Sequence, residues 1–180
     1  MVSSLKQLNH QWQYEDKIMG NLINYQKGDV IDAFIENDNT YLIHGVNCQG
    51  VMNAGIAKQI AKVFPEVKEE YENAVETLER LKIDKTNLLG KMIDVTTNSG
   101  VVGNLFTQYT YGTYQKQFNC GAFVSALDKF IMKWEKPNKT INIVMPRIGT
   151  GLAGERWVKV EGCLKQFSSR NVNFTVYDLE

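Results

Sequence analysis

Hydrophobic positions follow two different spacings along the chain, and segments of the two kinds alternate. Short apolar runs bounded by turn residues are typical of buried strands, whereas apolar positions three or four residues apart are typical of helices covering a sheet. The runs predict strands over residues 21–27, 41–46, 91–96, 101–109, 141–145 and 173–177. The helical spacing predicts helices over residues 54–64, 66–81, 122–134 and 156–167. This alternation predicts an α/β layered fold with a largely parallel central sheet.

Turn and breaker residues set the boundaries of these elements. The helix over 54–64 has to end before Pro65, because the residue before a proline avoids helical backbone. The turn Asn98-Ser99-Gly100 lies between two predicted strands and predicts a β-hairpin. Residues 1–19 are polar with scattered apolar side chains, which predicts an N-terminal extension that is either helical or loose. Residues 20–180 are predicted to form one domain.

Composition and charge narrow the class of protein. A length of 180 residues with 43% hydrophobic residues is ordinary for one globular domain. Acidic and basic residues balance at 20 each, so no bulk nucleic-acid binding is expected. No apolar run approaches the ~20 residues of a membrane span, and the N-terminal segment lacks the apolar core of a signal peptide. We therefore expect no membrane partner and a cytoplasmic monomer.

The cysteines and histidines give no sign of a metal site. Cys48, Cys120 and Cys163 are widely spaced and odd in number, which argues against a disulfide framework or a zinc ribbon and fits a reduced compartment. His10 and His44 have no accompanying cluster of acidic residues. No metal and no cofactor are therefore expected.

Two predicted strands end in loops rich in small residues, and each loop leads into a helix. The first reads NCQGVMNAGIA (47–57) and the second PRIGTGLAG (146–154). Ligands of α/β sheets bind beyond the carboxyl ends of the strands, and the free N–H groups at a helix N-terminus attract anions. Two such loops would suit a diphosphate held from both sides. The alternative is that the glycines only turn the chain.

Familiar phosphate motifs do not account for these loops. The chain has no GxxxxGK[ST] segment and no GxGxxG after a strand. A cysteine phosphatase built on Cys48 would need an arginine six residues later, where the chain has Ala54. Cys48 is instead predicted to be a small buried residue beside the loop.

Six motifs carry a resemblance to a known family. They are KGDV (27–30), LIHGVNCQGVMNAGIAKQIAKVFPEV (42–67), LLGK (88–91), NLFTQYTYG (104–112), MPRIGTGLAGERW (145–157) and FTVYDL (174–179). In this order and spacing they resemble the macrodomains, which bind ADP-ribose. The nearest branch is the ADP-ribose 1″-phosphate phosphatases, which share a strand-end histidine followed by a glycine-rich loop. The resemblance implies a three-layer α/β/α sandwich around a mixed six-stranded sheet. It also implies hydrolysis of ADP-ribose 1″-phosphate to ADP-ribose and phosphate.

The resemblance also implies roles for individual residues. Asp29, after Gly28, would accept a hydrogen bond from the adenine amine beside the Val30 backbone. Asn47 would lie near the distal ribose, and His44 falls where this branch places a functional histidine, here a candidate general acid or base. The remaining substrate-binding residues would be Gly45 and Val46, a first phosphate loop of Val51, Met52, Asn53, Ala54, Gly55 and Ile56, and a second loop of Ile148, Gly149, Thr150, Gly151, Leu152, Ala153 and Gly154.

The chain departs from the family pattern in two places. A run of three glycines in the first loop is replaced by Asn53-Ala54-Gly55. A related branch removes ADP-ribose from proteins with a lysine and an aspartate, and those positions carry Gln108 and Ala153. A mono-ADP-ribosyl hydrolase and a non-catalytic ADP-ribose reader remain the alternatives to a phosphatase.

Each candidate side chain also has a purely structural interpretation. His44 could be a core histidine, Asp29 could cap a turn, and Asn47 could be a turn residue. Arg147 could bind a phosphate or lie on the surface, and Thr150 could bind a phosphate or support its turn. The three tyrosines that follow one strand could form a wall near the distal ribose or pack under the loop: Tyr109, Tyr111 and Tyr114.

Overall fold

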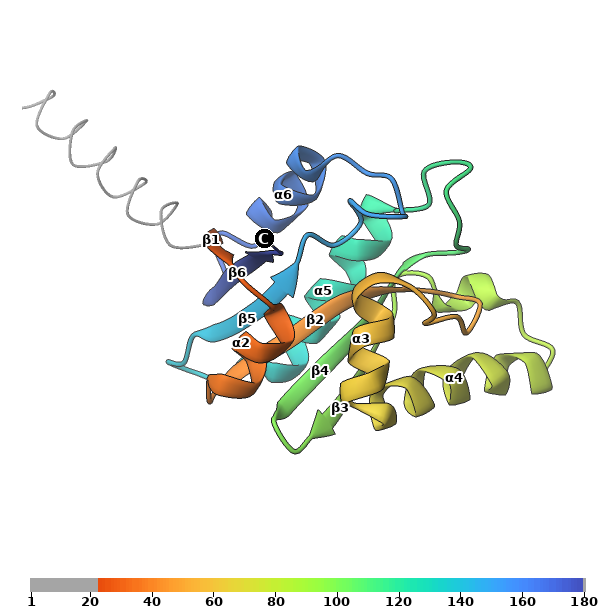
Figure 1. The fold of residues 1–180 in the computed structure, drawn as a ribbon, viewed down its shortest axis with the longest axis horizontal. Helices are drawn as coiled ribbons and strands as arrows, with labels where there is room; N and C mark the ends of the chain where they lie inside the picture. The colour runs from red at the N-terminus through yellow and green to blue at the C-terminus, as the bar shows by residue number, and fades with distance from the viewer. Residues whose placement is uncertain (1–22, 180) are drawn as a thin grey trace, which may run out of the picture.

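A mixed sheet of six strands runs through the centre of the computed structural model, which describes residues 23–179 (Figure 1). The strands lie in the order β1-β6-β5-β2-β4-β3. Their bounds are β1 (Ile23–Lys27), β2 (Thr40–Asn47), β3 (Met92–Thr97), β4 (Gly100–Gln108), β5 (Ile141–Pro146) and β6 (Val172–Asp178). Five strands are parallel and only β3 runs antiparallel, against β4. The carboxyl ends of the five parallel strands therefore meet at one edge of the sheet.

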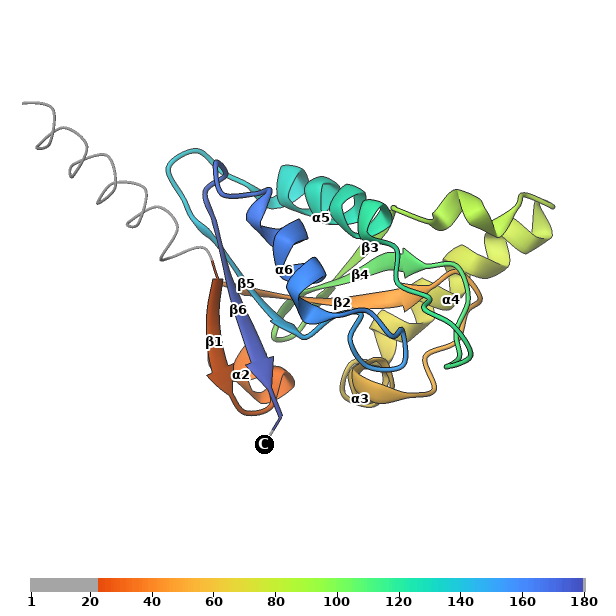
Figure 2. The same cartoon turned by 90° about the horizontal axis from the view of Figure 1, so that it is seen from above.

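Helices cover both faces of the sheet and complete the expected three-layer sandwich (Figure 2). The first layer holds α2 (Val30–Glu36), α3 (Gly55–Val63), α4 (Pro65–Arg80) and the short 3₁₀ helix η1 (Lys85–Leu88). The second layer holds α5 (Cys120–Trp134) and α6 (Trp157–Lys165).

Side chains of the central strand β2 alternate between the two layers, as the pleat of a strand requires. Leu42 and Val46 pack with the α2–α4 layer, whereas Ile43 packs with α5 and α6. All three are at most 3% exposed. A central parallel strand is buried on both faces, which explains why this segment reads as a continuous apolar run.

The predicted strands and helices are all present within the described residues, with ends shifted by a few positions. The predicted hairpin is confirmed, because β3 and β4 pair antiparallel around Asn98 and Ser99. Helix α2 was not predicted: seven residues make fewer than two turns, too few to show a helical spacing. The extension predicted over 1–19 lies outside the described residues. No helix within residues 23–179 is long and apolar enough to cross a membrane.

Candidate functional site

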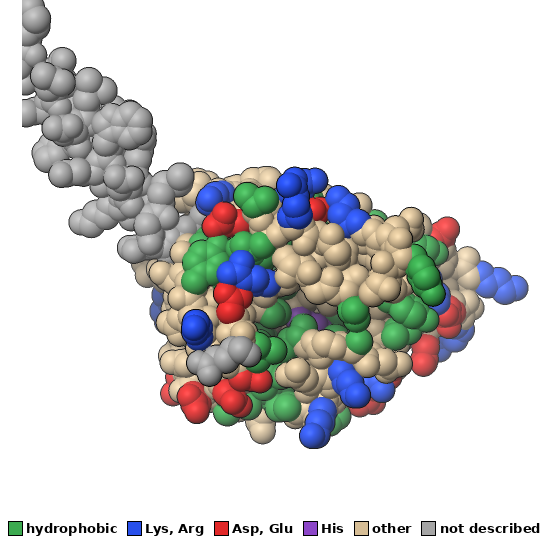
Figure 3. Space-filling view, turned by 45° about the horizontal axis from the view of Figure 1, so that its top comes forward, with side chains coloured by type: hydrophobic (Ala, Val, Ile, Leu, Met, Phe, Trp, Pro, Cys, Tyr) green, Lys and Arg blue, Asp and Glu red, His purple; other side chains and the backbone are tan. Residues whose placement is uncertain are grey.

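A cavity of about 500 Å³ opens at the carboxyl ends of β5, β2 and β4. Its lining comes from residues 45–57, 107–112 and 146–153, three segments far apart in the sequence. Figure 3 shows a hollow on this face with hydrophobic side chains around it. The volume lies within the usual range for small-molecule sites. A second cavity of about 530 Å³, between α5 and α6, contains none of the predicted site residues.

Helix α3 begins at this cavity without a side-chain cap. Its N-cap residue is Ala54, which offers no acceptor, and its first turn contains no acidic residue. The first N–H groups of a helix have no partner within the helix, so they carry partial positive charge. The cavity lining includes Gly55, Ile56 and Ala57 from this first turn. The first loop therefore brings free backbone donors to the cavity, as expected for an anion site.

The second loop faces the cavity in a tight conformation. The Thr150 N–H and hydroxyl both donate to the Arg147 carbonyl, and the Glu155 N–H donates to the Gly149 carbonyl at 2.8 Å. Gly149 has a φ of +81°, and a Cβ there would lie 2.4 Å from the Phe118 ring. This position therefore needs glycine for its backbone conformation and for space.

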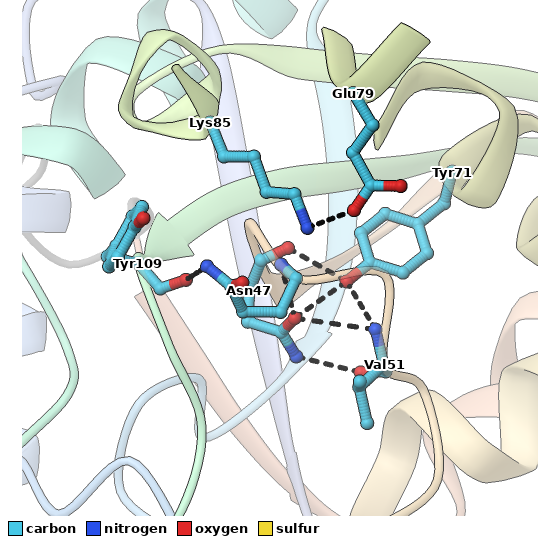
Figure 4. A network of polar contacts seen from close by, with 7 residues as sticks. Asn47, Val51, Tyr71, Glu79, Lys85 and Tyr109 are labelled. Carbon is cyan, nitrogen blue, oxygen red and sulfur yellow. Dashed lines mark hydrogen bonds and ion pairs between the residues drawn. The ribbon is translucent and has the colours of Figure 1, made fainter. Parts of the chain in front are cut away.

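The first loop is held by a buried network centred on Asn47 and Tyr71 (Figure 4). The Asn47 side chain accepts from the Gln49 N–H at 2.9 Å and donates to the Val51 carbonyl at 2.7 Å. The Tyr71 hydroxyl accepts from the Val51 N–H at 3.0 Å and lies 2.8 and 2.9 Å from the two oxygens of Asn47. Asn47 thus borders the cavity while its amide group holds the loop.

Cys48 is a buried thiol, as predicted. It has no exposed surface, and burial raises its pKa to about 11. The thiol therefore stays protonated at neutral pH and is not a nucleophile.

His44 is fully buried on β2 and is not part of the cavity lining. Its Nε2 lies 2.6 Å from Asn104 Oδ1, and the Asn104 amide donates to the Val67 carbonyl of α4. Because Oδ1 can only accept, Nε2 carries the proton. Burial lowers the His44 pKa to about 4, so the ring is neutral near pH 7. This placement matches the alternative of a core histidine, and a catalytic role for His44 stays a prediction.

Charged residues gather at the β1–β6–β5 end of the strand edge. The Arg147 guanidinium forms an ion pair with Asp178 that raises the pKa of Arg147 and lowers that of Asp178. It also lies over the rings of Tyr25 and Trp157, at 5.4 and 5.1 Å from their centroids. Asp29 caps α2 through Oδ1, which accepts from the Ile31 N–H at 2.7 Å.

Comparison with known proteins agrees with this geometry. No protein-family model matches the chain. It is 32% identical over 154 residues to an uncharacterized 17.5 kDa protein of Enterobacteria phage T4, covering 83% of this chain and 92% of that one. It is 31% identical over 183 residues to an ADP-ribose 1″-phosphate phosphatase of Saccharomyces cerevisiae, covering 87% of this chain and 98% of the relative. The macrodomain of Mycobacterium tuberculosis DarG superposes with a TM-score of 0.67 at 27% identity, over 87% of this chain and 97% of that structure.

The chain belongs to the macrodomain family. A DNA ADP-ribosyl glycohydrolase of Mycobacterium tuberculosis is also similar, at 29% identity over 78% of this chain and 37% of that larger protein. Two of these relatives are hydrolases by name, one a phosphatase and the other a glycohydrolase.

The macrodomain cavity brings together most, but not all, of the predicted binding residues. The predicted residues in its lining are Gly45, Val46, Asn47, Val51, Asn53, Ala54, Gly55, Ile56, Ile148, Gly149, Gly151, Leu152 and Ala153. The predicted residues outside the lining are Gly28, Asp29, Val30, Met52, Thr150 and Gly154, together with His44. Met52 is only 2% exposed and belongs to the core, and Thr150 supports its own turn.

Sequence reasoning missed the part of the lining that comes from β4. Thr107 and Gly112 were not singled out, although they follow in the motif NLFTQYTYG at the end of a predicted strand. Tyr109, Tyr111 and Tyr114 are all exposed, so none of the three packs under the loop, and of the three only Tyr111 lines the cavity. The available signal was the strand end itself, because every parallel strand that ends at this edge can contribute to the site.

Proposed function

We propose that this macrodomain binds ADP-ribose derivatives in the cavity and hydrolyses ADP-ribose 1″-phosphate to ADP-ribose and phosphate. The observation that carries the proposal is the pairing of the uncapped α3 N-terminus with the second loop across one cavity. Within residues 23–179, Arg147 is the one charged side chain of the lining, so no carboxylate repels a phosphate there. The similarity to ADP-ribose 1″-phosphate phosphatases along 87% of the chain supports this choice of substrate.

The backbone would do most of the binding in this proposal. The first-turn N–H groups of α3 and the second loop would hold the diphosphate between them. Hydrolysis then needs a water molecule to attack the terminal phosphorus while the bond to the ribose oxygen breaks. That oxygen leaves with a proton, and inorganic phosphate is released. Positioning and electrostatic stabilisation by fixed donors account for much of the rate in such reactions.

The decisive experiment is a time course of phosphate release from ADP-ribose 1″-phosphate by the purified chain. We expect release that scales with protein concentration and is inhibited by ADP-ribose, because product and substrate would share the cavity. A chain that binds ADP-ribose in calorimetry but releases no phosphate would be a non-catalytic reader, contrary to the proposal.

A second candidate is removal of ADP-ribose from nucleic acid. The similarity to DNA ADP-ribosyl glycohydrolases favours it. The position of the lysine used by a related branch carries Gln108, whose amide is neutral and donates to the Thr110 carbonyl at 2.9 Å. An ADP-ribosylated single-stranded oligonucleotide should therefore stay intact under conditions in which ADP-ribose 1″-phosphate is hydrolysed. Release of ADP-ribose from the oligonucleotide would establish the second candidate instead.

A further inference from the structure

The hydroxyl of Thr107 is buried, borders the cavity and has no hydrogen-bond partner. Thr107 is 1% exposed, and within the described residues only its Oγ1 and His44 Nδ1 are buried side-chain polar atoms without a partner. Of the two residues, Thr107 alone belongs to the cavity lining. An unpaired buried hydroxyl lowers stability, so it calls for an explanation in a folded protein.

An irregularity in the backbone of β4 sets the position of this hydroxyl. Val46 of β2 pairs with Phe106, and Asn47 pairs with Gln108, so Thr107 is the extra residue of a β-bulge. Bulges often lie next to functional sites, where they redirect a side chain. The bulge is fixed on its other side, because the Asn119 N–H donates to the Thr107 carbonyl at 2.8 Å.

Gly45 packs directly beside this hydroxyl. A Cβ on Gly45 would lie 2.7 Å from Thr107 Oγ1 and 3.0 Å from Ile148 Cγ2. Gly45, Thr107 and Ile148 all line the cavity, so this close contact forms part of its wall. A side chain at position 45 would press on Thr107 and Ile148, so this part of the cavity wall needs glycine.

The surroundings of Thr107 suit a sugar better than a phosphate. The charged residues Asp178 and Arg147 lie at the ends of β6 and β5, on the far side of β2 from Thr107. At the β4 end the polar lining consists of neutral groups: the hydroxyls of Thr107 and Tyr111 and the amides of Asn47 and Gln108. The two amides already donate within their own loops, which leaves Thr107 as the unsatisfied group. A threonine hydroxyl both donates and accepts, as sugar hydroxyls do.

We propose that Thr107 hydrogen-bonds the sugar that lies beyond the diphosphate and thereby selects ADP-ribose over ADP. The inference rests on the proposed function, since it assumes that the two loops hold a diphosphate. It adds a specificity-determining residue that lies outside both loops. In this arrangement ADP fills the phosphate positions but leaves the Thr107 hydroxyl unpaired, whereas ADP-ribose satisfies it.

The test compares ADP-ribose with ADP by titration calorimetry on wild type, Thr107→Val and Thr107→Ser. Valine has nearly the shape of threonine without the hydroxyl, and serine keeps the hydroxyl. We expect Thr107→Val to bind ADP-ribose about 10-fold more weakly, with ADP affinity changed by less than about 2-fold. Thr107→Ser should stay close to wild type. The ligand-free Thr107→Val protein should melt no lower than wild type, because it loses a hydroxyl that has no partner.

The outcomes separate this inference from the proposed function. Wild type that binds no ADP-ribose overturns both. Wild type that binds ADP-ribose, with Thr107→Val binding it equally well or losing ADP to the same extent, overturns only the assignment of Thr107. Should Thr107→Val melt well below wild type, the comparison moves to Thr107→Ser against Thr107→Ala. These two differ in the hydroxyl alone, and equal ADP-ribose affinities in that pair overturn the assignment too.

Discussion

Polar side chains around the cavity differ in whether they find hydrogen-bond partners within the protein. Asn47 and Thr150 bond within their own loops, and Asp29 caps α2. For each of these residues the sequence allowed either a structural or a ligand-binding role, and the observed bonds are structural. Their contacts with a ligand stay predictions. Thr107 and His44 instead carry buried atoms without a partner.

The neutral state of His44 predicts a specific dependence of stability on pH. Its pKa is about 4 in the folded chain against an ordinary value of 6.5, because burial disfavours the charged ring. Between pH 6.5 and 4 the unfolded chain therefore takes up a proton that the folded chain does not. Stability from this residue is complete above pH 6.5 and is lost as the pH falls towards 4, by about 3 kcal/mol in all.

Urea unfolding of wild type and His44→Gln at several pH values would measure this dependence. Glutamine can still donate to Asn104 Oδ1 but does not titrate, so carboxylates elsewhere affect both proteins alike. As the pH falls from 6.5 to 4, the unfolding free energy of wild type should fall by more than that of His44→Gln. Any stability advantage of wild type over the variant should therefore shrink or be reversed. Parallel pH profiles would show that His44 is not held neutral.

Helix α3 is the element that most directly creates the proposed anion site. Its N-terminus lacks a side-chain cap, and α4 follows it directly after Phe64. The loop that leads into it is held at Val51 by the Asn47–Tyr71 network. Anion binding in the cavity should therefore be sensitive to a charge placed at the first residue of α3.

Gly55→Glu should abolish ADP-ribose binding. A Cβ at Gly55 meets no heavy atom within 4 Å, so the new side chain enters open space in the cavity lining. Its negative charge would oppose the diphosphate, and the φ of +55° adds some backbone strain. Calorimetry should detect no binding at ligand concentrations that saturate wild type, while circular dichroism keeps the native spectrum.

The matched control is Gly162→Glu on α6. Gly162 is also exposed with no heavy atom within 4 Å of a Cβ, but it lies outside the cavity lining. This variant carries the same change in charge and should bind ADP-ribose like wild type. Normal binding by Gly55→Glu would mean that the α3 N-terminus holds no anion.

The cavity is formed by segments of the domain that are distant in the sequence. Residues 45–57, 107–112 and 146–153 follow three different strands, and they meet only because those strands are parallel neighbours in the sheet. A ligand that touches all three segments would bind the folded chain and not the unfolded one. Ligand binding should then be coupled to global unfolding.

ADP-ribose should raise the melting temperature of the whole domain. At about 100 times the dissociation constant, a ligand specific for the folded state adds about 2.7 kcal/mol. For a chain of this length that corresponds to a shift of about 5–10 °C. Differential scanning calorimetry over a range of concentrations would measure it, with ribose alone as the control. An unchanged melting temperature at millimolar ADP-ribose would contradict binding to the folded cavity.

The sequence by itself determined the order and type of nearly all the elements described. Hydrophobic spacing records which face of a strand or helix is buried, and each spacing is visible within one short window. The two small-residue loops were visible for the same local reason, since a strand end, glycines and a helix start adjoin in the chain. Helix α2 could not be recognised in the sequence, because seven residues are too few for a helical spacing of apolar positions to repeat.

Only the tertiary structure decided what the residues of the site can do. His44 lies in a buried run in either view, but its neutral state depends on complete burial in the folded chain, and the position of its proton depends on Asn104 of another strand. The free hydroxyl of Thr107 depends on the register between β2 and β4 and on the missing side chain at Gly45. Burial, register and hydrogen-bond partners are properties of segments far apart in sequence, and no local pattern contains them.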